Sequence, residues 1–131
     1  MSQKEIELIL IRQLASYLAM AVFIVDAVGN LVFYNEPAER ILGHRFDETG
    51  EMPATEWATA WAPTDEQGNA IGPEALPLWI ALHDNRVATS RFWIRALDNV
   101  PRYIEVVAFP LLGQGERRLG AVSLLWEAEP V

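Results

Sequence analysis

The chain contains no cysteine among its 131 residues. Disulfide bonds, thiolate metal sites, cysteine nucleophiles and photochemistry that forms a bond to cysteine are therefore all excluded. Basic residues are missing from residues 46–85, a stretch that holds eight of the eighteen acidic residues, and the formal net charge is −8. We interpret this stretch as a solvated loop face. Because phosphate backbones are bound by clustered cations, we expect no direct contact with nucleic acid.

A long apolar run is also missing. The N-terminal segment MSQKEIELIL contains two acidic residues, and its apolar run is too short and too interrupted for a signal peptide or a membrane span. We therefore expect a cytoplasmic protein that has no membrane partner.

Catalytic motifs are scarce as well. The chain has no nucleophile-elbow, zinc-protease or phosphate-loop motif, and its two histidines, His44 and His83, lie far apart in the sequence. Residues 65–69 lack the alternating ligands and the closing glutamate of a calcium loop, so we interpret them as a turn. We expect no catalytic residue and no metal site, and we predict that the protein is not an enzyme.

The apolar periodicity predicts one domain that combines helices with an antiparallel sheet, which is an α+β fold. Helices are expected over 3–19, 55–61 and 74–84, and three strands are expected over 87–97, 102–112 and 117–127. The segment 44–75 is punctuated by proline and glycine and is otherwise predicted to be loop.

The segment from Ala21 to Gly43 has the most specific local pattern. Two short β-rich runs, 21–26 and 31–34, are separated by Gly29-Asn30, which supplies positive φ values for a hairpin turn. Asn35 offers a side-chain acceptor to the first turn of a helix, and Gly43 can end that helix.

This segment resembles the opening of a PAS domain, the sensor module of bacterial signalling proteins. The resemblance continues through four later segments, although Glu127-Ala128-Glu129 stands where the family commonly has Asp-Ile-Thr before an effector. The four segments are the Pro-led helix 77–82, the turn Asp98-Asn99, the strand end 108–111 and the last-strand motif 120–122.

The resemblance implies a five-stranded antiparallel sheet in the order 2-1-5-4-3, with short helices on one face. It also implies a flanking helix over residues 1–20, a sensor domain over 21–127 and a tail over 128–131. Such a domain would bind a small apolar ligand or a partner and pass a conformational change to a downstream effector, as in the control of transcription.

Pocket residues are expected between the sheet and the short helices, and our candidates are Leu42, Leu78, Leu82, Ile94, Val106 and Val122. Some PAS domains bind haem through a histidine near the helix that contains His83. That side chain shares a helical face with Trp79 rather than with the apolar residues, which argues against haem. The five tryptophans could line an aromatic pocket for a flavin, but tryptophans in a small domain more often fill the core. We expect no cofactor.

The N-terminal helix has apolar residues around more of its circumference than one sheet can cover. We therefore expect a homodimer with an interface that includes Ile6, Leu10, Leu14 and Leu18. Three alternatives remain open: a ligand-free dimerisation or scaffold module with a filled cavity, a haem-binding gas or redox sensor, and a small α+β enzyme that uses an acid or histidine as general base.

Overall fold

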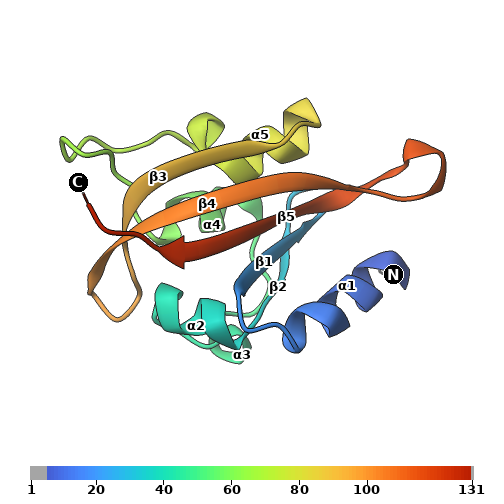
Figure 1. Ribbon diagram of the computed structural model, residues 1–131, viewed down its shortest axis with the longest axis horizontal. Coiled ribbons are helices and arrows are strands. Elements are labelled where there is room, and N and C mark those ends of the chain that lie inside the picture. Colours follow the sequence, from blue (N-terminus) through green and yellow to red (C-terminus); the bar gives the residue numbers. More distant parts are fainter. Residues whose placement is uncertain (1–5, 131) are drawn as a thin grey trace.

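The computed structural model describes residues 6–130 (Figure 1). An outer helix and two strands come first, short helices follow, and three long strands complete the chain. The elements are α1 (Ile6–Ser16), β1 (Ala21–Asp26), β2 (Leu31–Tyr34), α2 (Glu36–Leu42), α3 (Phe46–Thr49), α4 (Ala54–Ala60), the 3₁₀ turn η1 (Pro73–Ala75), α5 (Pro77–Asp84), β3 (Ala88–Arg95), β4 (Pro101–Leu112), the 3₁₀ turn η2 (Gln114–Glu116) and β5 (Arg118–Glu127).

The five strands form one antiparallel sheet in the order β2-β1-β5-β4-β3. This confirms the predicted fold class and strand order. The first strand therefore lies between its hairpin partner and the last strand, so the two ends of the domain sequence meet at the middle of the sheet. Within the described residues, no helix has the length and apolar character that crossing a membrane demands.

The two faces of the sheet have separate apolar cores, because successive side chains of a strand point to opposite faces. The larger core lies between the inner face and α2, α4 and α5, and it contains Phe23, Ile104 and Leu125. The smaller core lies on the outer face, where Leu8 and Ala15 of α1 pack with residues of β1, β2 and β5. The helix α1 covers only part of that face, along the β1–β2 side (Figure 1).

Asn35 joins three elements through its side chain. Its Oδ1 accepts hydrogen bonds from Ala38 N at 3.2 Å, as an N-cap of α2, and from Val22 N at 3.0 Å. Its Nδ2 donates to Ala15 O at 2.8 Å and to Met20 O at 2.9 Å. The side chain is 1% exposed, and its donors and acceptors are all used. It therefore ties the end of α1 and the start of β1 to the start of α2.

The glycines flanking this region have the backbone that the sequence suggested. Gly29 has φ +94° in the β1–β2 turn, whereas Asn30 is not among the residues with positive φ. Gly43 ends α2 with φ +80°, and a Cβ atom there would lie 2.7 Å from the backbone nitrogen of Asp98. The end of α2 is thus held directly against the β3–β4 turn.

The edges of the sheet carry two short bridges that the sequence did not indicate. Thr64 pairs with Trp93 of β3 through hydrogen bonds of 2.8 and 2.9 Å, and Met52 pairs with Leu31 of β2. The loop 44–75 therefore contributes to both edges. Pro110 lies where β4 extends beyond β3, whose ladder ends at Ala88↔Ala108, so its missing N–H removes no bond on that side.

The helix predicted over 3–19 is shorter in the structure, where α1 ends at Ser16. Residues 17 and 18 form a last turn through hydrogen bonds to Leu14 O and Ala15 O. Residues 3–5 of the predicted helix lie outside the described residues.

Candidate ligand-binding site

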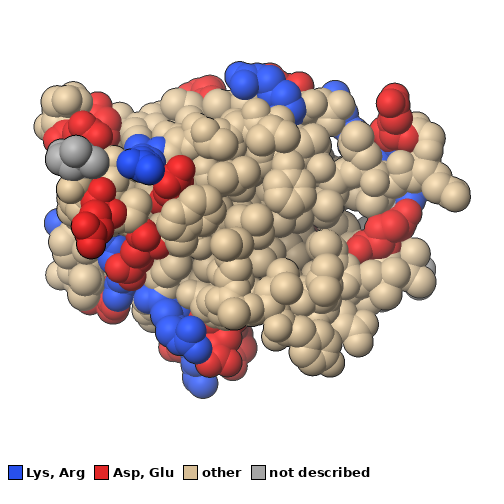
Figure 2. Space-filling view, in the orientation of Figure 1, with Lys and Arg blue, Asp and Glu red and all other residues tan. Residues whose placement is uncertain are grey.

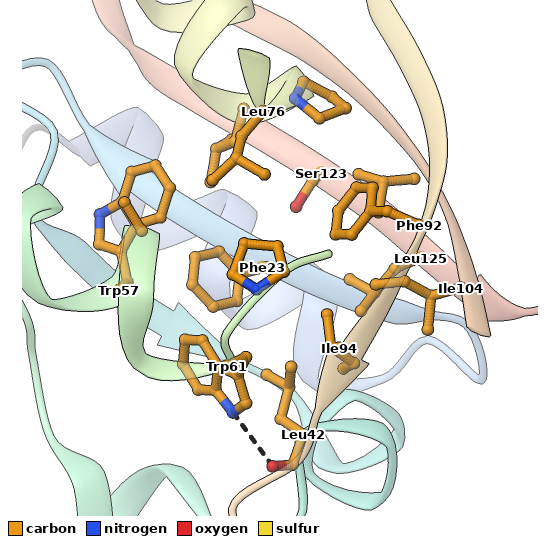
Figure 3. Close-up of a pocket in the computed structure, with 15 residues that line it drawn as sticks. Phe23, Leu42, Trp57, Trp61, Leu76, Phe92, Ile94, Ile104, Ser123 and Leu125 are labelled. Carbon is orange, nitrogen blue, oxygen red and sulfur yellow. Dashed lines mark hydrogen bonds between the residues drawn. The ribbon is translucent and has the colours of Figure 1, made fainter. Parts of the chain in front are cut away.

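A cavity of about 80 Å³ lies between the inner face of the sheet and the helices α4 and α5. Its floor is formed by strand residues such as Phe23, Ile104 and Leu125, and its walls come from α2, α4 and the segment that leads into α5 (Figure 3). The lining residues are Phe23, Leu42, Trp57, Ala58, Trp61, Pro63, Leu76, Pro77, Leu78, Phe92, Ile94, Ile104, Val106, Ser123 and Leu125.

Two tryptophans form one wall, and both are fixed by hydrogen bonds to the backbone. Trp57 Nε1 donates to Gly29 O at 2.7 Å. Trp61 Nε1 donates to Leu42 O at 3.1 Å, the bond drawn as a dashed line in Figure 3. Both rings also pack edge-on against Phe23, with centroid separations of 6.0 and 5.8 Å. Since both indole N–H groups are used in this way, neither is free to bind a ligand.

Four of the six predicted pocket residues line this cavity: Leu42, Leu78, Ile94 and Val106. Leu82 packs against the same core but is not among the lining residues.

The placement of Val122 in the cavity was wrong. Its side chain packs on the outer face with Leu8 and Val32, because Ser123 and Leu125 are the β5 residues that point inward. A shift of one residue in a strand exchanges the two faces. β5 is apolar on both faces, so hydrophobicity alone did not distinguish them.

Electrostatically, the cavity is nearly neutral, because no ionisable side chain lines it. The perturbed groups lie nearby. Burial raises the pKa of the Tyr34 hydroxyl, which donates to His44 O at 3.0 Å. A hydrogen bond from Arg102 lowers the pKa of Asp98, and the same guanidinium donates to Ile41 O at 3.1 Å. Arg102 therefore fixes the end of α2 but offers no charge to the cavity.

His83 is exposed on α5 and is not among the cavity residues. Its ring stacks on Trp79 with centroids 4.4 Å apart, and its Nδ1 lies 3.1 Å from Trp79 O. An imidazole in this place cannot present a ring nitrogen to a group in the cavity, so the site does not fit haem. Among residues 6–130, no three His, Cys, Asp or Glu side chains gather as a metal site would require.

No protein-family model matches the chain, and no curated protein matches it. Solved structures do match. The LOV protein of Rhodobacter sphaeroides superposes with a TM-score of 0.72 and 16% identity, over 95% of this chain and 69% of that one. A PAS domain from Colwellia psychrerythraea gives a TM-score of 0.56 and 15% identity, over 93% of this chain and 97% of that one. The chain has the PAS fold.

Another matching structure is a LOV domain that was studied with a flavin analogue. It superposes with a TM-score of 0.65 and 11% identity, over 94% of this chain and 85% of that one. A flavin needs a larger and more polar site than the cavity of this chain provides. Sites for ligands of that size are about 300–1,000 Å³, whereas this cavity is about 80 Å³. Its walls also lack free polar groups for the edge of an isoalloxazine ring, apart from one serine. The residues present do not fit a flavin.

Proposed function

We propose that this chain is a sensor domain of a signal-transduction protein, and that a small molecule in the cavity changes how α1 is held. The PAS fold supports the general class, since domains of this fold include sensor modules. The proposal includes a cytoplasmic location and a downstream effector, for which the sequence resemblance is the support. The observation that carries the proposal is that the short helix α2 reaches the cavity at one end, and at the other end its capping residue Asn35 is hydrogen-bonded to α1.

At its C-terminal end, α2 contributes to the cavity wall. The side chain of Leu42 lines the cavity, and its carbonyl oxygen accepts hydrogen bonds from Trp61 Nε1 and from Leu97 N at 2.9 Å. A molecule that displaces Leu42 or Trp61 therefore strains the end of α2.

At its N-terminal end, α2 is joined to α1. Asn35 caps α2 while its amide nitrogen donates to the carbonyl oxygen of Ala15 in α1. The helix is only seven residues long, so a displacement of its C-terminal end also moves its N-terminal end. A ligand that binds one arrangement of α2 better than another shifts the population of α1 positions by the difference in binding free energy.

The test uses toluene as a probe and hydrogen exchange as the readout. At ten times its Kd, toluene is expected to raise the free energy of unfolding by about 1.4 kcal/mol. It is also expected to change the exchange protection of the α1 amides that pack on the sheet. Ala58→Met fills the cavity and should abolish both effects, whereas Thr59→Met on the exposed side of α4 should abolish neither.

Binding without a change in α1 would contradict the relay. Absence of binding, combined with a clear loss of stability in Ala58→Met because the larger side chain has no room, would favour the scaffold module with a filled cavity. Native mass spectrometry of the purified protein adds an independent check for a bound small molecule.

The same proposal includes a homodimer through α1. The side chains of Ile6, Leu10, Leu14 and Leu18 are 67%, 57%, 52% and 40% exposed. Figure 2 shows that this side of the molecule is mostly uncharged at its centre and carries its acidic and basic side chains towards the rim. Exposed apolar area of this kind costs about 25 cal/mol per Å² in water, so a second copy that covers it would be stabilised.

We expect the wild-type chain to sediment as a dimer at tens of micromolar, an ordinary concentration range for protein pairs. The double variant Leu10→Glu/Leu14→Glu should be a folded monomer, because both side chains face solvent and contribute nothing to the inner cores. Gln13→Glu, an exposed control on the same helix, should remain dimeric. A wild-type monomer at these concentrations would refute the dimer.

A further inference from the structure

The cavity contains one polar group that the protein itself does not use. Ser123, in the middle of β5, lines the cavity and is 3% exposed. Figure 3 shows its hydroxyl oxygen directed into the space between the walls. Among residues 6–130, no side chain or backbone group forms a hydrogen bond with this hydroxyl. The oxygen is not one of the fully buried atoms that lack a partner, so it can be reached from the cavity, and a polar group in an otherwise apolar wall calls for an explanation.

The neighbours of Ser123 leave room beside it. Its partners across the sheet are Phe23 in β1 and Ala108 in β4. Ala108 is small and fully buried, so the β4 residue directly opposite Ser123 places only a methyl group beside the hydroxyl. The remaining polar groups of the wall, the two indole N–H groups of Trp57 and Trp61, already donate to backbone oxygens. The Ser123 hydroxyl is thus the one uncommitted polar side-chain group among the lining residues that the structure describes.

We propose that the cavity takes a small, neutral, mostly apolar molecule with one hydrogen-bonding group, and that Ser123 recognises this group. The inference rests on the proposed function, because it concerns the same cavity. The apolar walls and the volume of about 80 Å³ set the size and the apolar character of the molecule. A serine hydroxyl both donates and accepts, so an alcohol, a phenol or a carbonyl compound can pair with it. An ion is disfavoured, since no charged side chain lines the cavity to offset its loss of water.

The experiment compares phenol with toluene, which have nearly the same size and differ in one hydroxyl. Their dissociation constants are measured by calorimetry for the wild type, for Ser123→Ala and for Ser90→Ala. Ser90 lies in β3 outside the cavity lining and provides the same chemical change as a control. In Ser123→Ala, the preference for phenol over toluene is expected to fall about tenfold relative to the wild type, which is the usual effect of one buried hydrogen bond. In Ser90→Ala it should stay unchanged.

A second readout needs no ligand. Because the Ser123 hydroxyl has no partner in the protein, Ser123→Ala should leave the Tm of the ligand-free protein unchanged or raise it by a few degrees. A fall of more than about 4 °C would show that the hydroxyl supports the fold, and would overturn the inference.

The outcomes separate this inference from the function on which it rests. If both probes bind and the phenol preference changes less than twofold in Ser123→Ala, the role of Ser123 is overturned and the sensor cavity stands. If neither probe binds the wild type, both are overturned.

Discussion

Asn35→Ala is expected to lower the free energy of unfolding by about 3 kcal/mol, well above the ~1 kcal/mol of an ordinary N-cap. The excess comes from the other bonds of the side chain. Without it, the buried amide of Val22 loses its partner, Ala15 O keeps only its bond from Leu18 N, and Met20 O loses a part-buried bond. For a domain of this size the expected fall in Tm is about 10 °C. Chemical and thermal unfolding of the purified variant measure it.

Asn35→Asp separates the cap from the link to α1. Aspartate is as good an N-cap as asparagine, so the acceptor bonds to Val22 N and Ala38 N are retained. It has no N–H donor, and it sets a carboxylate oxygen against the carbonyl oxygens of Ala15 and Met20. We expect a loss of stability close to that of Asn35→Ala. Wild-type stability in Asn35→Asp would show that only the capping bonds of Asn35 stabilise the fold. Asn69→Ala, at an exposed asparagine, serves as the control and should have little effect on stability.

Gly120→Ala is expected to be the most damaging single substitution. It should lower the free energy of unfolding by about 4 kcal/mol or prevent folding. Gly120 has φ +148° where β5 pairs with the end of β1. A Cβ atom there would overlap the carbonyl oxygen of Val25 and lie 2.9 Å from Asp26 Cα. Those atoms belong to the backbone of a central strand, so they can move only if the β1–β5 pairing opens.

Gly115→Ala is the matched control for this prediction. Gly115 also has positive φ, at +66°, but a Cβ atom there would have no heavy atom within 4 Å. The Gly115→Ala substitution should therefore lower the free energy of unfolding only by the penalty for a left-handed backbone, about 1 kcal/mol. Comparable losses in the two variants, measured by urea unfolding, would show that the backbone angle rather than the close approach of β1 sets the cost.

The sequence predicted those parts of the fold that depend on local chemistry. The run from Ala21 to Gly43 combines strand formers, a turn glycine, a capping residue and a terminating glycine, and each acts on residues only a few positions away. The strand order followed from the PAS resemblance and was confirmed. Local patterns were less informative for 44–75, where Phe46–Thr49 forms a short helix that was predicted as loop.

The candidate site was harder to predict, because its residues are chosen by tertiary contacts. The two strand residues missed, Ser123 and Leu125, alternate with Val122 and Leu124 in a strand that is apolar on both faces. Trp57 and Trp61 were recognised as large residues, but their hydrogen bonds reach 28 and 19 residues away in sequence, to Gly29 and Leu42. The link from Asn35 to α1 is equally non-local, because it depends on where the preceding helix ends.

The two bridges at the sheet edges affect how this protein can associate with other proteins. An edge strand with free N–H and C=O groups is a template for strand addition and for the growth of aggregates. Here Thr64 occupies the backbone groups of Trp93 on the β3 edge, Arg95 N is bonded to Trp61 O at 2.8 Å, and Met52 occupies those of Leu31 on the β2 edge. Strand addition at these positions would first have to displace Thr64 and Trp61 from β3 or Met52 from β2. Association through a flat face of the sheet needs no such displacement, and there side chains rather than backbone ladders decide which partner fits.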